Sequence, residues 1–170
     1  SIKSVTKSSV WVIQENDVIR MWEAACKDAE VKENVKHYLQ IFKSAFFIED
    51  LRDDSAPVRK SYEARGYKVV VIKFDDSMKF IWAIKKRPIS RVTDLTYENI
   101  RHITAAQLLE VIDRNFGGGW DSLSQSVQDV IQSGFDISTT TLPKDRLHKK
   151  GGLYEKKVED GFEVLEVAQG

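Results

Sequence analysis

Two segments of the sequence concentrate lysine and arginine, the side chains that most often contact phosphate groups. Five cations and no acid lie within residues 78–92, and six cations against two acids lie within residues 143–158. Clustered cations of this kind neutralise the phosphates of DNA or RNA. The candidate nucleic-acid-binding residues of the two segments are Lys79, Lys85, Lys86, Arg87, Arg91, Arg146, Lys149 and Lys150.

Aromatic residues interleave with the cations of the first segment. Phe80 and Trp82 alternate with other residues between Lys79 and Lys85. Exposed rings beside cations can stack unpaired bases while the cations hold the backbone. The same pattern also suits a strand whose rings belong to the core and whose lysines only solubilise an edge. The sequence leaves both interpretations open.

The chain as a whole is electrically balanced, with 26 Lys and Arg against 26 Asp and Glu among its 170 residues. A balanced chain is not a general polyanion binder. The acids collect elsewhere, at Glu49–Asp54 and Glu159–Glu166. Separated patches of opposite charge create local fields that the net charge hides, so the cationic segments remain candidate binding surfaces.

No combination of residues predicts a catalytic or metal centre. His37, His102 and His148 lack a second His, Cys or carboxylate at zinc-like spacing. Cys26, the only cysteine, lies in helical phase with Trp22, which favours a buried structural thiol. We therefore expect no catalytic residue, no metal ligand and no cofactor.

The glycines at residues 117–119 invite a phosphate-loop interpretation, because glycine lets backbone amides approach a phosphate closely. The segment lacks the lysine and Ser/Thr of a P-loop and follows a predicted helix. We interpret it as a connector between two helices, with Trp120 packed as an anchor. The carboxylates of Glu49–Asp54 do not match the spacing of an EF-hand loop, and we interpret them as a solvated acidic turn.

A β-hairpin is expected to position the first basic segment. Two apolar runs, Tyr67–Phe74 and Met78–Lys85, flank the turn-forming residues 75–77. This pattern predicts an antiparallel pair. Both runs are apolar at nearly every central position, which is typical of strands covered on both faces. The cations of residues 85–91 then lie near a strand end.

The N-terminal part is expected to be mainly helical. A short β-type run occupies Val10–Ile13, and apolar residues at helical spacing follow within residues 17–51. That stretch forms either one long helix or two helices joined near residues 27–30. Pro57 opens a further short helix, and Gly66 is well placed to end it.

The last third contains two well-punctuated helices and a predicted hairpin. Thr104–Phe116 begins with a capping box, and the second helix covers Asp121–Ser133. The Asp-Gly turn at residues 159–161 predicts a hairpin between Leu153–Val158 and Phe162–Val167.

The order of these elements is similar to that of a winged-helix module. In this resemblance residues 143–150 would be a short recognition helix, and residues 159–161 would be the tip of the wing. A phosphate-facing wing is usually cationic, whereas this tip is acidic, which argues against direct DNA contact by the wing.

These elements predict an α+β fold, with an antiparallel central β-hairpin packed with N-terminal helices, followed by a helical pair and a C-terminal β-hairpin. We expect a single domain over residues 1–170, divisible into subdomains 1–92 and 93–170 at a seam near Pro88–Asp94. The predicted core comprises Val12, Val18, Trp22, Val35, Leu39, Phe42, Val69, Val71, Phe80, Trp82, Ile84, Leu108, Ile112, Leu123, Val127 and Val164.

The sequence favours a non-enzymatic accessory domain that binds DNA or RNA through the phosphate backbone, as in a DNA-processing or mobile-element system. The alternative is a protein–protein interaction module, such as an adaptor, inhibitor or immunity-type protein. An enzyme without a recognisable motif is the third hypothesis. The single cysteine, the absence of a signal-peptide pattern and the lack of any span-length apolar run lead us to expect a cytoplasmic protein with no membrane partner.

Overall fold

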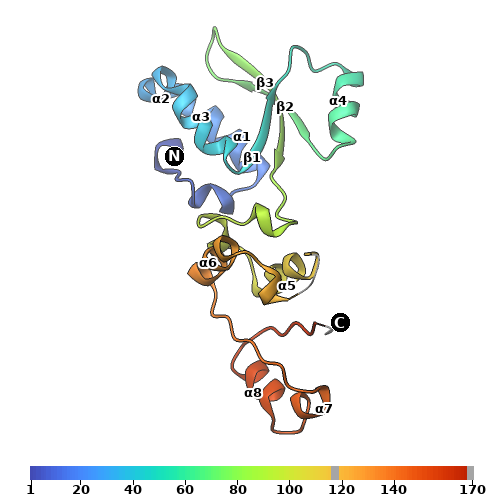
Figure 1. The fold of residues 1–170 in the computed structure, drawn as a ribbon. Coiled ribbons are helices and arrows are strands. Elements are labelled where there is room, and N and C mark those ends of the chain that lie inside the picture. The colour runs from blue at the N-terminus through green and yellow to red at the C-terminus, as the bar shows by residue number, and fades with distance from the viewer. Residues whose placement is uncertain (116–118, 168–170) are drawn as a thin grey trace. The chain divides into compact units, whose positions relative to one another are not determined.

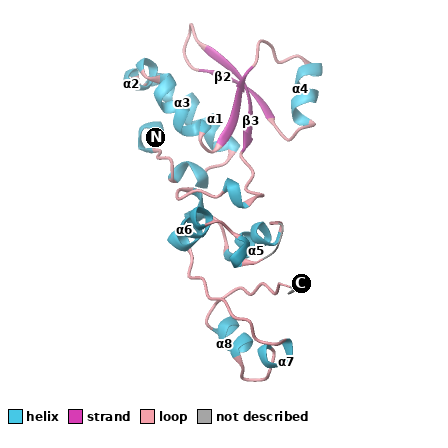
Figure 2. Ribbon diagram, in the orientation of Figure 1, coloured by secondary structure: helices cyan, strands magenta, loops and turns pink. Residues whose placement is uncertain are grey.

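The computed structural model describes residues 1–115 and 119–167. The chain divides into two compact units, Ser1–Arg87 (unit 1) and Pro88–Gly170 (unit 2). Unit 1 contains a three-stranded sheet, and the elements described in unit 2 are helices (Figures 1 and 2). The predicted α+β class is therefore confirmed.

The sheet of unit 1 is antiparallel throughout, in the order β1-β3-β2. Its strands are β1 (Phe46–Asp50), β2 (Lys68–Lys73) and β3 (Lys79–Lys86). The predicted central hairpin is the β2–β3 pair and is confirmed. Its turn is held by the Asp75 carboxylate, which accepts hydrogen bonds from the backbone amides of Ser77 (2.8 Å) and Met78 (2.7 Å).

The prediction of helix up to residue 51 is wrong at its C-terminal end, because β1 begins at Phe46. Helix α3 ends at Lys43, and the chain then pairs with β3 in the register Phe46↔Lys86 to Asp50↔Trp82. The predicted β-type run at Val10–Ile13 is also wrong, since Ser9–Val12 forms a 3-10 helix. Val12 is 59% exposed there and is not a core residue.

One face of the sheet is covered by the N-terminal helices (Figure 1). These are α1 (Glu15–Ala24), α2 (Ala29–Glu33) and α3 (Val35–Lys43), with short 3-10 turns at Ile2–Ser4 and Ala25–Lys27. Trp22 of α1 packs edge-on against Trp82 of β3 (5.5 Å between centroids) and Phe42 of α3 (5.6 Å). All three rings are fully buried, so this aromatic group is the centre of the unit 1 core.

Helix α4 (Ala56–Glu63) lies against the opposite face of the sheet (Figure 2). Pro57 occupies its first turn as predicted, and Gly66 reverses the chain after it with φ of 89°. The Arg59 guanidinium donates to the Val69 carbonyl at 2.9 Å, which ties the helix to β2. The sheet is thus covered on one face by three helices and on the other by one short helix.

Unit 2 is built on a helical pair that confirms the prediction. Its longer helices are α5 (Ala105–Asp113) and α6 (Gln125–Gly134), preceded by 3-10 turns at Val92–Asp94, Asn99–His102 and Trp120–Ser122. Thr104 and Gln107 form the predicted capping box, with each side chain accepting from the other residue's amide. The buried core of the unit consists of Leu95, Ile100, Leu108, Val111, Ile112, Leu123 and Ile131.

The predicted C-terminal hairpin is wrong. Leu153–Glu159 is helix α8, which follows the single-turn helix α7 (Lys144–Leu147). The amide of Phe162 donates to the Lys157 carbonyl (2.9 Å) and that of Gly161 to the Val158 carbonyl (3.0 Å), with φ of 89° at Gly161. This is the Schellman pattern that ends a helix, so the Asp-Gly pair is a helix terminus and the wing of the winged-helix resemblance does not form.

Candidate nucleic-acid interface

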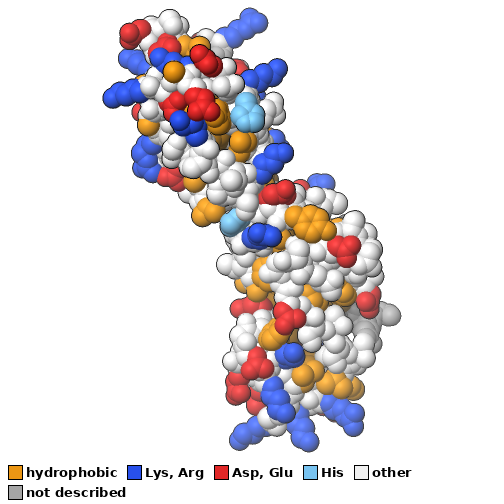
Figure 3. Space-filling view, turned by 90° about the vertical axis from the view of Figure 1, so that its left-hand side faces the viewer, with side chains coloured by type: hydrophobic (Ala, Val, Ile, Leu, Met, Phe, Trp, Pro, Cys, Tyr) orange, Lys and Arg blue, Asp and Glu red, His pale blue; other side chains and the backbone are white. Residues whose placement is uncertain are grey.

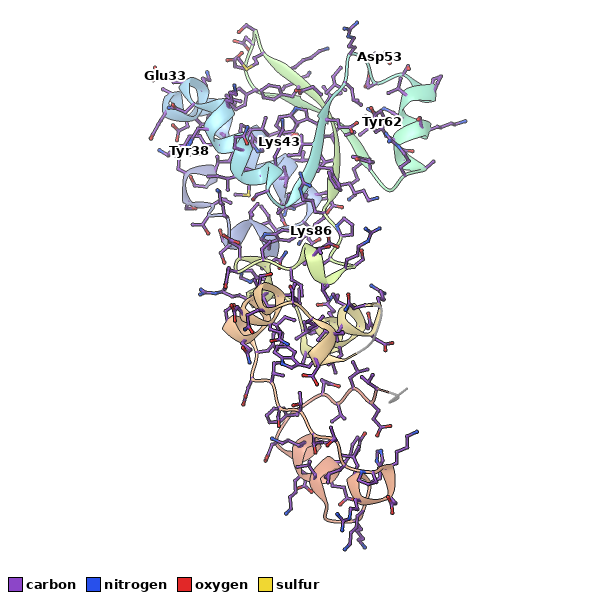
Figure 4. All side chains as sticks on the ribbon, in the orientation of Figure 1. Glu33, Tyr38, Lys43, Asp53, Tyr62 and Lys86 are labelled. Atoms are coloured by element: carbon purple, nitrogen blue, oxygen red, sulfur yellow. The ribbon has the colours of Figure 1, made fainter. Side chains whose placement is uncertain are left out.

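Lys85, Lys86 and Arg87 are adjacent in sequence, but the strand sends them to opposite faces of the sheet. Lys86 lies on the core face at the end of β3 (Figure 4), where its ammonium donates to the carbonyls of Trp11 (2.5 Å) and Ile13 (3.0 Å). Burial lowers the pKa of Lys86, while the nearby carboxylates of the α1 N-terminus act in the opposite direction. The Lys86 side chain therefore has a structural role inside unit 1.

Phe80 and Trp82 also lie on the core face. Trp82 is fully buried, and its indole nitrogen donates to the Asp50 carboxylate at 2.8 Å. Phe80 stacks on Trp82 with 4.8 Å between ring centroids. The core interpretation is confirmed for Trp82, and Phe80 is a half-buried ring that packs against the same core.

Lys85 and Arg87 lie on the other face of the sheet, where they meet rings from different elements. Lys85 is the cross-strand partner of Phe47, and its ammonium lies 5.7 Å from the centre of the Tyr67 ring. The Arg87 guanidinium lies 4.3 Å from the centre of the Phe47 ring. Phe47 is 36% exposed, so this part of the surface is open to solvent.

A third cation joins this surface from the turn after α4. The Arg65 guanidinium lies 4.6 Å from the ring centre of Tyr62 and 5.3 Å from that of Tyr67. Tyr62, labelled in Figure 4, is on the side of α4 that faces the sheet. A hydrogen bond with Glu49, together with burial, raises the pKa of Tyr62.

We name this group the cation–ring surface. It consists of Phe47, Tyr62, Arg65, Tyr67, Lys85 and Arg87. Of these six residues, the sequence predicted only Lys85 and Arg87 as binding residues. A signal for three others exists in the stretch from Tyr62 to Tyr67, where two tyrosines flank an arginine within six residues. Phe47 carried no such signal, because its place depends on the pairing of β1 with β3.

Lys79 lies at the opposite end of β3 from Lys85. It is exposed and is the cross-strand partner of Lys73, next to the β2–β3 turn. Because a strand rises about 3.3 Å per residue, roughly 20 Å separates Lys79 from Lys85 along β3. Lys79 is therefore not part of the cation–ring surface.

The second basic segment gathers around the turn between α7 and α8. Arg146 lies in α7, and Lys149 and Lys150 lie in the turn that follows, all three exposed. Across the described ranges 1–115 and 119–167, none of these three side chains makes an ion pair or a hydrogen bond. We name this group the α7–α8 turn surface. Lysine and arginine side chains gather in the part of Figure 3 that shows α7 and α8, at the bottom of the view.

The backbone of the turn is well defined by its own hydrogen bonds. The Gly152 amide donates to the Lys149 carbonyl (2.8 Å), and the Gly151 amide donates to the Glu155 carboxylate (2.7 Å). Gly151 has φ of 73°, a conformation that residues with a β-carbon rarely adopt. These bonds hold consecutive lysines on a tight reversal of the chain.

His148 and Arg91 have local structural partners. The His148 ring forms a hydrogen bond with the Glu166 carboxylate and lies 4.5 Å from the Tyr154 ring, which ties the extended segment after α8 to α7. The amide of Arg91 donates to the Asp94 carboxylate at 2.9 Å, while its own side chain is at the surface. In the part of the chain that the structure describes, no three His, Cys, Asp or Glu side chains come together as metal ligands.

The remaining candidate segments have simple locations. Gly117 and Gly118 lie outside the described residues, and Gly119 (φ 75°) precedes the 3-10 turn that begins at Trp120. Trp120 is half-buried against the unit 2 core, and Cys26 is half-buried against the unit 1 core. A shallow depression of about 290 Å³ near the N-terminus is lined by the polar residues Ser1, Arg20 and Asp28 and by the apolar residues Ile2, Met21, Ala24, Ala25 and Val31.

Comparison with known proteins yields no relative: no family model, no curated protein and no solved structure matches this chain. None of the helices formed by residues 1–115 and 119–167 combines the length and the apolar character needed to cross a bilayer.

Proposed function

We propose that this chain is a non-enzymatic domain that binds nucleic acid through the phosphate backbone. The α7–α8 turn surface of unit 2 supplies the main contacts, and the cation–ring surface of unit 1 supplies further ones. The observation that carries the proposal is the exposure of Arg146, Lys149 and Lys150 without an intramolecular partner among the described residues.

Unpaired, solvated cations are the groups whose phosphate contacts release counterions from nucleic acid. Lys86 is excluded from this role because its ammonium is partly desolvated on the core face of the sheet, where it donates to two backbone carbonyls. Arg146, Lys149 and Lys150 have no such internal task, and the short turn that holds them keeps their charges close together. A local positive field of this kind operates even though the whole chain is neutral.

The test is a fluorescence titration of labelled duplex and single-stranded oligonucleotides over a series of salt concentrations. The variant Arg146→Gln/Lys149→Gln/Lys150→Gln removes the turn surface. Each lost phosphate contact reduces the slope of log K against log salt by about 0.9 on duplex DNA, so the expected loss of slope is about 2 to 3. Affinity falls for both forms of nucleic acid.

A matched control removes the same amount of charge from unit 1. The variant Lys7→Gln/Lys27→Gln/Lys36→Gln alters three exposed lysines outside both surfaces. It is expected to bind as the wild type does. If both triple variants lose the same affinity, the effect is due to net charge and not to the α7–α8 turn surface. If the wild-type protein does not bind at low salt, the proposal is refuted.

A further inference from the structure

The cation–ring surface of unit 1 combines its cations with aromatic rings, whereas the α7–α8 turn surface consists of the cations Arg146, Lys149 and Lys150. Arg65 lies against two tyrosine rings and Arg87 against Phe47. A guanidinium that lies over a ring keeps its outer face and its edge N–H groups available to a ligand. Such a surface offers flat platforms together with hydrogen-bond donors for anions.

The cations of this surface are held in position by the backbone. The Lys85 ammonium donates to the Arg65 carbonyl at 2.8 Å, and Nε of Arg87 donates to the Lys43 carbonyl at 2.9 Å. An ammonium has three donors and a guanidinium has five, so each side chain retains donors for a ligand. Prior ordering of this kind reduces the entropy lost on binding.

The planar groups favour single-stranded over duplex nucleic acid. Unpaired bases stack on aromatic side chains and on arginine planes, whereas bases within a duplex are already stacked on their neighbours. One carboxylate, that of Glu49, also faces this region, where it interacts with Tyr62. The surface still carries three cations against this one acid.

We infer that the cation–ring surface makes the protein prefer single-stranded over duplex nucleic acid, with bases stacked on the guanidinium planes of Arg65 and Arg87, which the rings of Tyr62 and Phe47 support, and phosphates bound by Lys85. The inference rests on the proposed function for the claim that nucleic acid is the ligand. It adds the form of nucleic acid and the residues that select it.

The test uses the full chain with a labelled oligothymidylate, which forms no duplex, and a short mixed-sequence duplex at one salt concentration. Phe47→Leu removes the ring that supports the Arg87 guanidinium and keeps an apolar side chain. Loss of one stacked base weakens single-strand binding about 5- to 150-fold, while duplex binding changes by no more than about twofold. Arg65→Lys keeps the charge and removes the plane, so it is expected to shift the preference in the same direction.

The control is Tyr97→Leu, which removes an exposed ring (55% exposed) from unit 2. It is expected to leave both affinities unchanged, and circular dichroism of each variant verifies the fold. Equal weakening of single-strand and duplex binding by Phe47→Leu would overturn the inference, because only electrostatics would then operate.

Two further outcomes separate this inference from the proposed function. If the α7–α8 turn variant weakens binding while Phe47→Leu and Arg65→Lys change nothing, the inference fails and the proposed function stands. Polyglutamate is titrated in parallel as an acidic peptide. If the surface variants weaken polyglutamate binding and leave oligothymidylate binding intact, the ligand of this surface is an acidic protein and the inference is refuted.

Discussion

At the scale of single residues, side-chain direction decides which cations can act on a partner. Lys85 and Lys86 are chemically identical neighbours, yet the Lys85 ammonium lies over the half-buried Tyr67 ring and the Lys86 ammonium donates to the carbonyls of Trp11 and Ile13. The two-residue period of a strand accounts for the difference. Consecutive basic residues in a strand therefore alternate between its two faces, so only about half of them can contact a partner on one face.

Replacing Lys86 by Met is expected to destabilise unit 1. The change leaves two carbonyls without their donor, and an unmet buried hydrogen bond costs about 1 to 3 kcal/mol. Urea unfolding followed by tryptophan fluorescence measures the free energy of unfolding. The control Lys79→Met, at the exposed end of β3, is expected to lie within about 0.5 kcal/mol of wild type. If Lys86→Met leaves the free energy of unfolding unchanged and lowers the affinity for duplex DNA, Lys86 belongs to the binding surface instead.

Replacing Asp94 by Asn tests an acid-sensitive contact in unit 2. Burial acts to raise the pKa of Asp94, but hydrogen bonds from the amides of Arg91 and Ser90 outweigh it, so the pKa lies below its usual value. A carboxylate with a depressed folded-state pKa contributes stability above its unfolded value of about 3.9, and that contribution is lost as the pH falls through the folded-state pKa.

Asp94→Asn is expected to lower the free energy of unfolding at pH 7 by about 1 kcal/mol. The cost is modest because the carboxylate is mostly solvated and its hydrogen bonds are screened. Thermal unfolding at a series of pH values measures it. The difference from wild type is expected to shrink as the pH falls below about 3.9. Asp136→Asn, at an exposed site, serves as the control, and a pH-independent difference would contradict the assignment.

At the scale of elements, one dipeptide decides between a hairpin and a helix terminus. Asp160-Gly161 predicts a tight β-turn when the flanking residues are taken as strands. In the structure the same glycine, with φ of 89°, ends α8 and lets the Phe162 amide reach the Lys157 carbonyl. Both uses need a glycine that tolerates positive φ, so the local signal cannot separate them.

Gly161→Ala is expected to destabilise α8, because alanine at positive φ costs about 1 kcal/mol. NMR Cα shifts over residues 153–159 report the helix, and amide exchange reports its stability. Asp160→Ala, at φ of –78°, is the matched control and is expected to preserve α8. Strand-like shifts over residues 153–159 in the wild type would restore the hairpin and refute the helix.

At the scale of the whole molecule, the neutral net charge conceals two cationic surfaces, one on each unit. Each unit has its own buried core, one around Trp22 and Trp82 and the other around Ile100, Ile112 and Ile131. The boundary between Arg87 and Pro88 coincides with the start of the stretch where the sequence suggests a seam. We propose that the units bind nucleic acid by different means, one through cations held against aromatic rings and the other through exposed cations.

The sequence by itself determined the features that depend on neighbours in the chain. The β2–β3 hairpin follows from its turn residues, α5 from its capping box, and α4 from its N-terminal proline. Only the tertiary structure decided that Phe47 belongs to a strand and which face each of Lys85, Lys86 and Arg87 occupies. The reason is physical: local hydrogen bonds and turn conformations are set within a few residues, whereas strand pairing and burial are set by partners far away in the chain.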